Sequence, residues 1–179
     1  KVKQLRGALL DVYGQTVVIL GLGRQGTALA QYMAARGARV RVSDLRTEDQ
    51  LSEALATLDS FPIEYTFGQH PLALLHDTEA LYLSGGVPAD ISLVLEARQR
   101  GISVSNDSQV FLESAPCPVV GITGSAGKTT TTALVGKMGE LSTRYRKVWV
   151  GGNIGNPLLS DMGNVESDDL AAMELSSFQ

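Results

Sequence analysis

A glycine-rich segment that ends in Lys-Thr carries residue types suited to binding the phosphates of a nucleoside triphosphate. It covers residues 121–130, reads Gly-Ile-Thr-Gly-Ser-Ala-Gly-Lys-Thr-Thr, and follows a short apolar segment at 118–121. Consecutive backbone N–H groups of such a loop can surround phosphates, and the N-terminus of a following helix adds a positive dipole. The Lys128 ammonium can then reach the terminal phosphates, and the Thr129 hydroxyl can bind Mg²⁺. We therefore predict a phosphate-binding loop here.

This loop departs by one position from the strict spacing G-x-x-x-x-G-K-[ST], because Ile122 stands where the first glycine would be. A plain glycine-rich turn without a ligand is the alternative interpretation. The residues that we expect to contact the nucleotide are Gly124, Ser125, Ala126, Gly127, Lys128, Thr129 and Thr130.

A second glycine motif, Gly-Leu-Gly-Arg-Gln-Gly, occupies residues 21–26 and follows an apolar segment rich in β-branched residues at 16–20. Asp44 ends the next predicted strand, eighteen residues after Gly26. This is the G-x-G-x-x-G fingerprint of dinucleotide-binding folds in its proper context. The fingerprint predicts a diphosphate site but does not identify a nicotinamide, and a tight turn without a ligand is the alternative.

Alternating strands and helices must position these two loops. The β-α-β order along the chain predicts an α/β fold in which helices cover a parallel sheet. We predict strands at 16–20, 38–43, 63–67, 80–83, 102–104, 118–121, 147–150 and 170–173. We predict helices at 27–36, 48–58, 90–100, 108–114 and 129–141.

The sequence predicts two domains, with a boundary near Asn106-Asp107, where a new helix can begin. The first, 1–106, is expected to be Rossmann-like, and the second, 107–179, to be a P-loop α/β domain. A phosphate-loop sheet usually has about five strands, whereas about three are predicted after Pro116. We therefore expect the second domain to be truncated.

Composition excludes several other classes of protein. The 179 residues carry a net charge of −4, so we expect no extended basic face for nucleic acid. No apolar run approaches the ~18 residues of a membrane span, and residues 1–14 lack the apolar core of a signal peptide. The single cysteine, Cys117, excludes a disulfide framework, favours the cytoplasm and is expected to be a packed apolar residue. His70 and His76 do not suggest a metal site.

Taken in order, the motifs of this chain resemble those of the Mur ligase family over its whole length. The resemblance would cover the first domain and the opening part of the central ATPase domain of a three-domain enzyme. The last two motifs most resemble the members that add D-glutamate to UDP-N-acetylmuramoyl-L-alanine. The motifs are the two glycine loops, Ser43-Asp44-Leu45-Arg46, Ser84-Gly85-Gly86, Gly151-Gly152-Asn153-Ile154-Gly155 and Glu174-Leu175-Ser176-Ser177-Phe178-Gln179.

The resemblance implies that the first glycine motif binds the UDP of the substrate and not NAD. Asp44 and Arg46 would hold the uracil and its neighbourhood, and Ser84 would contact the sugar-diphosphate side. Asn153 would lie near the reacting end of the substrate, with Ser176 and Gln179 as neighbours. The substrate-binding residues implied are Gly21, Leu22, Gly23, Arg24, Gln25, Gly26, Asp44, Arg46, Ser84, Asn153, Ser176 and Gln179.

The resemblance also implies an ATP-dependent amide ligase with Lys128, Glu174 and Asn153 as catalytic residues and with Thr129 and Glu174 as Mg²⁺ ligands. The alanyl carboxylate would attack the γ-phosphate of ATP to form an acyl phosphate, from which the D-glutamate amine would displace phosphate. Positioning and charge neutralisation dominate such a step, which suits Lys and Mg²⁺. The enzyme would be a cytoplasmic bacterial monomer, and we expect this fragment alone to be inactive.

Three departures from the family pattern affect details of the expected binding. Ala126 stands where the family loop commonly has Asn, which removes one polar contact near the phosphates. Gly85 replaces the Pro of a frequent Ser-Pro-Gly, so we expect a looser loop. Residues 106–109 are less acidic than the corresponding family segment.

Four alternatives remain open from the sequence. One is a nicotinamide oxidoreductase built on residues 21–44, although it would have no use for the loop that contains Lys128. Another is a P-loop kinase or GTPase, although the separate first domain argues against it. The third is a nucleotide-binding module without catalysis, and the fourth is another Mur ligase that adds L-alanine, a diamino acid or a dipeptide.

Overall fold

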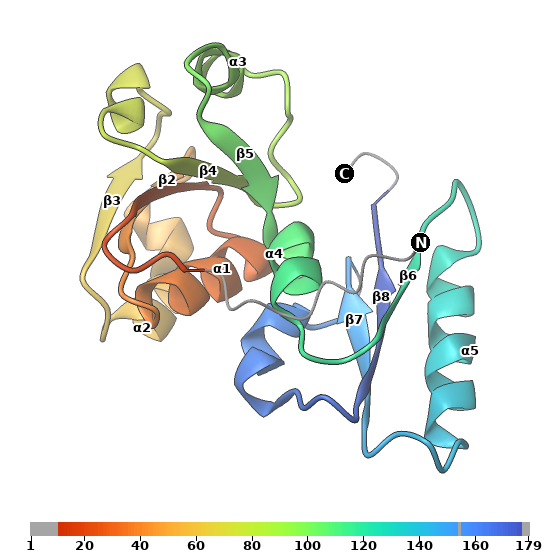
Figure 1. Cartoon of the computed structure of the whole chain (residues 1–179). Coiled ribbons are helices and arrows are strands. Elements are labelled where there is room, and N and C mark those ends of the chain that lie inside the picture. Colours follow the sequence, from red (N-terminus) through yellow and green to blue (C-terminus); the bar gives the residue numbers. More distant parts are fainter. Residues whose placement is uncertain (1–10, 154, 177–179) are drawn as a thin grey trace. The chain divides into compact units, whose positions relative to one another are not determined.

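The computed structural model describes residues 11–153 and 155–176, which fall into two compact units (Figure 1). The first unit comprises residues 11–107, and the second begins at Ser108. No helix within the described residues is long and apolar enough to cross a membrane.

A five-stranded parallel sheet forms the centre of the first unit. Its strands lie in the order β3-β2-β1-β4-β5. Every residue of the central strand β1 is buried, as expected for a parallel strand covered on both faces. The strands are β1 (Thr16–Leu20), β2 (Arg39–Asp44), β3 (Ile63–Phe67), β4 (Ala80–Leu83) and β5 (Ser103–Asn106).

Helices cover both faces of this sheet. α1 (Arg24–Ala34) contacts β1, β2 and α2 (Ser52–Leu58), while α3 (Ser92–Gln99) contacts β5 and the 3₁₀ turn Leu72–Leu75. Figure 1 shows α3 on the opposite side of the strands from α1 and α2. The core on the α3 side contains Val18, Leu20, Leu74, Leu75, Leu81, Leu93, Val94 and Ala97.

The strand order creates a crevice between β1 and β4. The chain runs outward from β1 through β2 to β3 and then returns to β4 on the other side of β1. In open α/β sheets, ligands bind outside the carboxyl ends of the strands at such a reversal of strand order. A ligand site is therefore expected beside the segments that follow β1, β2 and β4.

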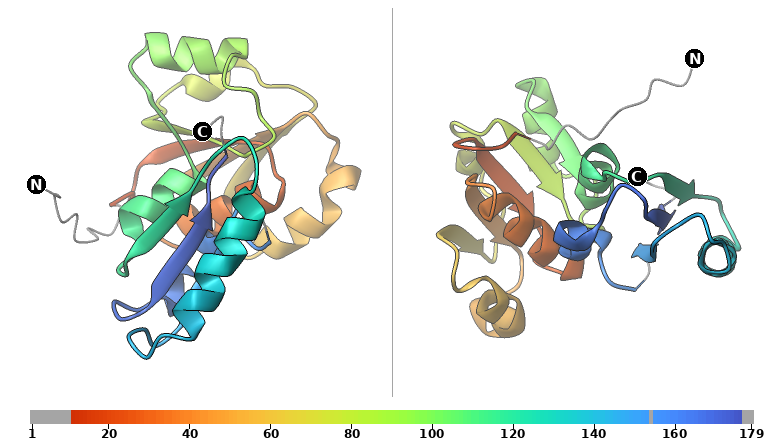
Figure 2. Two further views of the ribbon diagram at one scale, coloured as in Figure 1. Left: turned by 90° about the vertical axis from the view of Figure 1, so that its right-hand side faces the viewer. Right: turned by 60° about the horizontal axis from the view of Figure 1, so that its bottom comes forward.

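The second unit contains a smaller parallel sheet of β6 (Val119–Ile122), β8 (Leu170–Glu174) and β7 (Val148–Gly152), with β8 in the middle. α5 (Lys128–Glu140) lies along this sheet (Figure 2). α5 approaches the sheet closely because Gly136 and Gly139 of the helix face the strands. A Cβ atom at either position would overlap valine or leucine side chains of β7 and β8. The unit also contains α4 (Asp107–Ser114) and a 3₁₀ helix, Leu158–Asn164.

A buried carboxylate fixes one end of this smaller sheet. Asp169 is fully buried, and its Oδ2 accepts hydrogen bonds from Arg146 Nη2 at 2.8 Å, from Trp149 Nε1 at 2.8 Å and from the Glu166 N–H at 2.9 Å. Cys117 is also buried, and burial raises the pKa of its thiol. The prediction that Cys117 is a packed residue is thus confirmed.

All strands predicted from the sequence are present, with ends shifted by one or two residues at most. The predicted helix at 48–58 is instead a 3₁₀ turn, Glu48–Leu51, followed by α2. The helix start expected near Asn106-Asp107 is present, because Asn106 ends β5 and α4 begins at Asp107. The 3₁₀ segments Leu72–Leu75 and Leu158–Asn164 were not predicted, because neither has the length or periodicity that marks an α-helix in a sequence.

Candidate functional site

The first glycine motif forms the tight turn between β1 and α1. Gly21 adopts a positive φ of 84°, and its N–H donates to the carbonyl of Ser43 at 2.8 Å. A Cβ atom on Gly26 would overlap the carbonyl oxygen of Gly21, so only glycine allows α1 to begin this close to the turn. Gly23 precedes α1 without a side-chain cap, an arrangement that suits a helix N-terminus directed at an anion.

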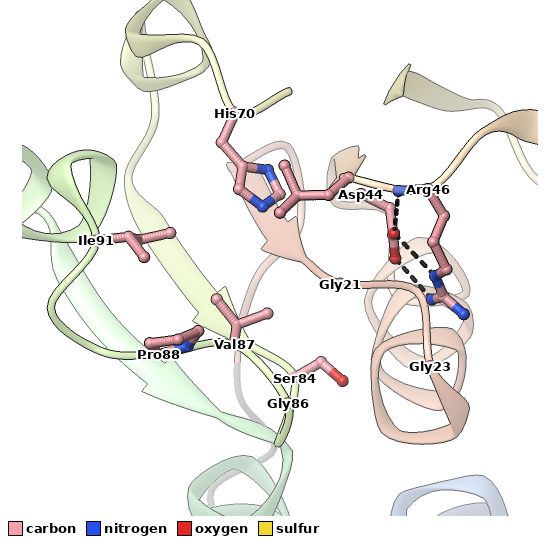
Figure 3. Close-up of a pocket in the computed structure, with 11 residues that line it drawn as sticks. Gly21, Gly23, Asp44, Arg46, His70, Ser84, Gly86, Val87, Pro88 and Ile91 are labelled. Carbon is pink, nitrogen blue, oxygen red and sulfur yellow. Dashed lines mark hydrogen bonds and ion pairs between the residues drawn. The ribbon is translucent and has the colours of Figure 1, made fainter. Parts of the chain in front are cut away.

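The buried carboxylate of Asp44 holds this turn in place. Its Oδ2 accepts the Leu22 N–H at 2.6 Å and Arg46 Nη2 at 2.7 Å. Its Oδ1 accepts the backbone N–H of Arg46 at 2.9 Å and Arg46 Nε at 3.0 Å. Figure 3 shows the guanidinium of Arg46 lying against this carboxylate. The end of β2 is thereby tied to the glycine loop after β1.

Asp44 remains ionised despite its burial. Burial alone would raise the pKa of this carboxyl, but the hydrogen bonds from Arg46 and Leu22 outweigh that effect and lower the pKa to about 2. The carboxylate therefore balances the Arg46 charge, and this part of the site is close to neutral before any ligand binds.

A pocket of about 360 Å³ opens at the carboxyl ends of β1, β2 and β4, where the strand order predicts one (Figure 3). One end is formed by the glycine turn and Ser84, and the other is mostly apolar. The lining residues are Gly21, Gly23, Asp44, Leu45, Arg46, His70, Ser84, Gly86, Val87, Pro88 and Ile91.

The structure places the remaining predicted substrate residues of the first unit around this pocket rather than in its lining. Leu22 and Gly26 are buried and support the turn, and Arg24 is exposed on the first turn of α1. Gln25 reaches across to the loop after β4, where its Oε1 accepts the Gly85 N–H at 3.1 Å. This bond restrains a loop that we expected to be loose, and a proline at position 85 would lack the N–H that forms it.

His70 lines the pocket and was not selected from the sequence. Its Nδ1 lies 2.7 Å from the Ser43 Oγ, and burial lowers the pKa of its imidazole, an effect that the Asp44 charge opposes. The chain turns toward the pocket at Gly68, two residues before His70. Gly68 has a φ of 77° and donates its N–H to the Asp44 carbonyl at 2.8 Å. His70 could have been selected from the sequence as a polar residue that follows a predicted strand, 63–67, of the same sheet.

The second glycine loop joins β6 to α5 in the second unit. Lys128 Nζ donates to the Gly124 carbonyl at 2.7 Å, so the ammonium lies across the loop. Gly127 adopts a φ of 74° and precedes α5 without a side-chain cap. The other predicted contact residues, Ser125, Ala126, Thr129 and Thr130, are exposed.

Three predicted residues meet at the carboxyl end of β8. Thr129 Oγ1 donates to Glu174 Oε2 at 2.8 Å, and the Glu174 side chain is buried. The Asn153 N–H donates to the Glu174 carbonyl at 2.9 Å, directly after Gly152, whose φ is 104°. Ser176 follows β8 by two residues, whereas Gln179 lies outside the described residues.

Comparison with known proteins identifies the family. Residues 15–106 match the family model described as "Mur ligase MurD-like, N-terminal domain". The chain belongs to the Mur ligase family. It is 37% identical over 169 residues to the UDP-N-acetylmuramoylalanine–D-glutamate ligase of Ruminiclostridium cellulolyticum, which corresponds to 94% of this chain and 36% of that protein. It is 38% identical over 170 residues to the ligase of the same name from Koribacter versatilis, covering 95% of this chain and 37% of the relative.

The chain thus spans little more than a third of the length of these relatives. Solved structures of Mur ligases share the fold at lower identity. The UDP-N-acetylmuramate:L-alanyl-gamma-D-glutamyl-meso-diaminopimelate ligase from Neisseria meningitides matches with a TM-score of 0.54 and 19% identity, over 93% of this chain and 55% of that one. A pseudomurein peptide ligase type C from Methanothermus fervidus matches with a TM-score of 0.51 and 23% identity, over 92% of this chain and 33% of that one.

Proposed function

We propose that this Mur ligase chain holds the UDP end of a nucleotide-linked substrate in the pocket of its first unit. The observation that carries the proposal is the Asp44 carboxylate, which fixes the glycine turn through the Leu22 N–H at 2.6 Å. A turn fixed in this way can present backbone N–H groups and the start of α1 to a diphosphate. The neighbouring apolar end of the pocket, with Val87 and Ile91, suits the flat face of a base.

The second unit is proposed to be the opening part of an ATP-binding domain, with residues 1–106 and 107–179 as the two domains. Lys128 Nζ donates to the carbonyl of Gly124 in its own loop, a neutral acceptor that a phosphate can replace. The apolar side chains of Leu134 and Met138 on α5 and of Leu141 just after it are 58%, 71% and 87% exposed, which favours a larger domain that covers them.

Mg²⁺ suits the oxygen ligands available here. Among residues 11–153 and 155–176 no group of three His, Cys, Asp or Glu side chains could hold a metal. Mg²⁺ does not require such a cluster, because it binds through one or two protein oxygens, water and substrate phosphates. Thr129 and the buried Glu174, already in contact with each other, would supply the protein ligands. A cation held there would neutralise negative charge on the phosphates.

The reaction proposed is the addition of D-glutamate to UDP-N-acetylmuramoyl-L-alanine through an acyl phosphate, at the expense of ATP. Its support is the name shared by the curated relatives, at 37% and 38% identity over this part of the chain. Lys128 would draw charge from the transferred phosphoryl group, and Asn153 would orient the reacting end of the substrate. We expect the isolated fragment to be inactive.

Phosphate release from ATP by the full-length protein that carries this chain tests the proposal. With UDP-N-acetylmuramoyl-L-alanine and Mg²⁺ present, release should require D-glutamate. L-Alanine, a diamino acid and a dipeptide serve as the comparison substrates. A requirement for one of these instead would assign the chain to a different reaction within the family. Reduction of NAD without phosphate release would refute the ligase function.

A further inference from the structure

His70 brings an imidazole ring into the otherwise apolar end of the pocket in the first unit. Val87, Pro88 and Ile91 line the same end and offer no polar side-chain atoms. Figure 3 shows the ring projecting toward the space that Val87 and Ile91 border. Any hydrogen bond between a base at this end and a side chain there would therefore involve His70.

The hydrogen bonds of Ser43 determine which ring nitrogen of neutral His70 carries the proton. Ser43 Oγ donates to the carbonyl oxygen of Gln69 at 2.8 Å, and this uses the single hydroxyl hydrogen. The His70 Nδ1 at 2.7 Å must then be the donor to Ser43 Oγ, since two facing lone pairs would repel each other. Nε2 consequently carries a lone pair, and it belongs to the edge of the ring turned away from Ser43, toward the pocket.

Asp44 offers no comparable acceptor for a base. Each of its two carboxylate oxygens already accepts two hydrogen bonds, from Leu22 and from Arg46. An ionised carboxylate has about four acceptor positions, so those of Asp44 are filled before a ligand enters. The lone pair of His70 Nε2 is the acceptor that remains at this end of the pocket among the described side chains.

We propose that His70 determines base specificity by accepting the ring N3–H of uracil at Nε2. Cytosine has a lone pair at the same ring position and would face Nε2 with two acceptors and no hydrogen. The pocket would therefore bind UDP in preference to CDP. The inference rests on the proposed function, because it assumes that the pocket takes a nucleoside diphosphate.

Calorimetric titration of the chain with UDP and with CDP at pH 8 provides the test. We expect UDP to bind the unmodified chain more tightly, and His70→Phe to reduce the UDP/CDP preference by roughly fivefold, the worth of one hydrogen bond. The Phe ring keeps the planar shape, and Ser43 keeps its bond to the Gln69 carbonyl. His76→Phe is the matched control, since the His76 side chain is 80% exposed and lies outside the pocket lining.

A second measurement needs no substitution. Protonated His70 would donate from Nε2, so the UDP/CDP preference should fall as the pH is lowered from 8 through the pKa of the imidazole, which burial holds below its ordinary value. The other titratable groups facing the ring, Asp44 and Arg46 at the end of β2, keep their charges over this range. The lining residues from the loop after β4 and from the segment before α3 do not titrate. UDP and CDP carry the same diphosphate, so its protonation changes both affinities alike and leaves the UDP/CDP ratio unchanged.

The outcomes separate this inference from the proposed function. A UDP/CDP preference that is unchanged both in His70→Phe and at pH 5 would overturn the role of His70 while leaving a UDP site in place. Loss of the preference in Asp44→Asn but not in His70→Phe would assign base recognition to Asp44 instead. If neither UDP nor CDP binds the unmodified chain, the proposed function of the first unit fails.

Discussion

The two glycine loops of this chain occupy equivalent places in their sheets but are built differently. Each follows a parallel strand and leads into a helix that begins without a side-chain cap, at Gly23 in one and at Gly127 in the other. The first loop has no lysine; Asp44 at the end of β2 holds it through the Leu22 N–H, and its own Gln25 accepts the Gly85 N–H of the loop after β4. The second carries its own cation, Lys128, beside the Thr129–Glu174 pair.

The first kind of loop suits the binding of a phosphate that stays intact, and the second kind suits the transfer of a phosphoryl group. A diphosphate that stays intact needs fixed N–H donors, and a loop held by buried hydrogen bonds supplies them. A phosphoryl group that moves develops charge, which a lysine and a metal site can offset. The proposed function therefore gives binding to the first loop and chemistry to the second, and the predictions below test that proposed division.

Lys128→Ala in the full-length protein should reduce turnover by about a thousandfold, because one preorganised charge at the transferred phosphoryl group is lost. Binding of UDP-N-acetylmuramoyl-L-alanine should remain, since Lys128 belongs to the other unit. Steady-state kinetics and calorimetry measure the two effects. Lys137→Ala, on the exposed side of the same helix, is the control. Retained activity in Lys128→Ala would refute the role of the second loop.

Gly26→Ala should destabilise the first unit by about 3 kcal/mol, because the new methyl group overlaps the Gly21 carbonyl in a closely packed turn. Urea unfolding measures the loss. Gly86→Ala should have little effect, because a Cβ atom there meets no atom within 4 Å. Equal stability of the two variants would mean that the turn is not as tightly packed as described.

Asp44 should make stability depend on acid pH. Its folded pKa of about 2 lies below the ordinary value of 3.8, so its contribution is complete above pH 3.8 and is lost as the pH falls toward 2. The shift corresponds to about 2 kcal/mol. The difference in unfolding free energy between the unmodified chain and Asp44→Asn should shrink by that amount between pH 5 and pH 2. Asp77→Asn, at a carboxyl that is 75% exposed, is the control substitution.

Gln25→Ala should weaken UDP binding severalfold, because the loop after β4 loses a restraint worth about 1 kcal/mol. The unfolding free energy should change less than in Gly26→Ala. Titration with UDP measures the effect. An unchanged dissociation constant would mean that the loop after β4 is held in place without Gln25.

The strands and both glycine loops could be predicted because local signals specify them. Apolar runs such as Thr16–Leu20 mark buried parallel strands, and a glycine motif between strand and helix marks a phosphate-binding turn. Asp44 was expected near the ligand from the glycine fingerprint, whereas Arg46 and Ser84 were implied by the family resemblance, and all three line the pocket. Such features depend on residues that are near one another in the chain.

Contacts between distant residues could not be predicted in the same way. Gln25 and Gly85 are 60 positions apart, and Ser43 and His70 are 27 apart. Gln25 and Gly85 meet because β1 pairs with β4, whereas Ser43 and His70 meet because β2 pairs with β3 and the chain turns at Gly68. The sequence therefore indicated a role for Asp44 at the ligand, whereas the structure adds that its carboxylate is occupied by Leu22 and Arg46.

Calorimetric titration of the chain with UDP-N-acetylmuramoyl-L-alanine and with NADH tests the central claim most directly. The chain, its Asp44→Ala variant and its Lys128→Ala variant are compared. We predict saturable binding of the UDP-linked ligand but not of NADH, lost in Asp44→Ala and retained in Lys128→Ala. Binding of NADH alone, or loss of the UDP-linked ligand in Lys128→Ala with retention in Asp44→Ala, would contradict the division of roles between the two loops.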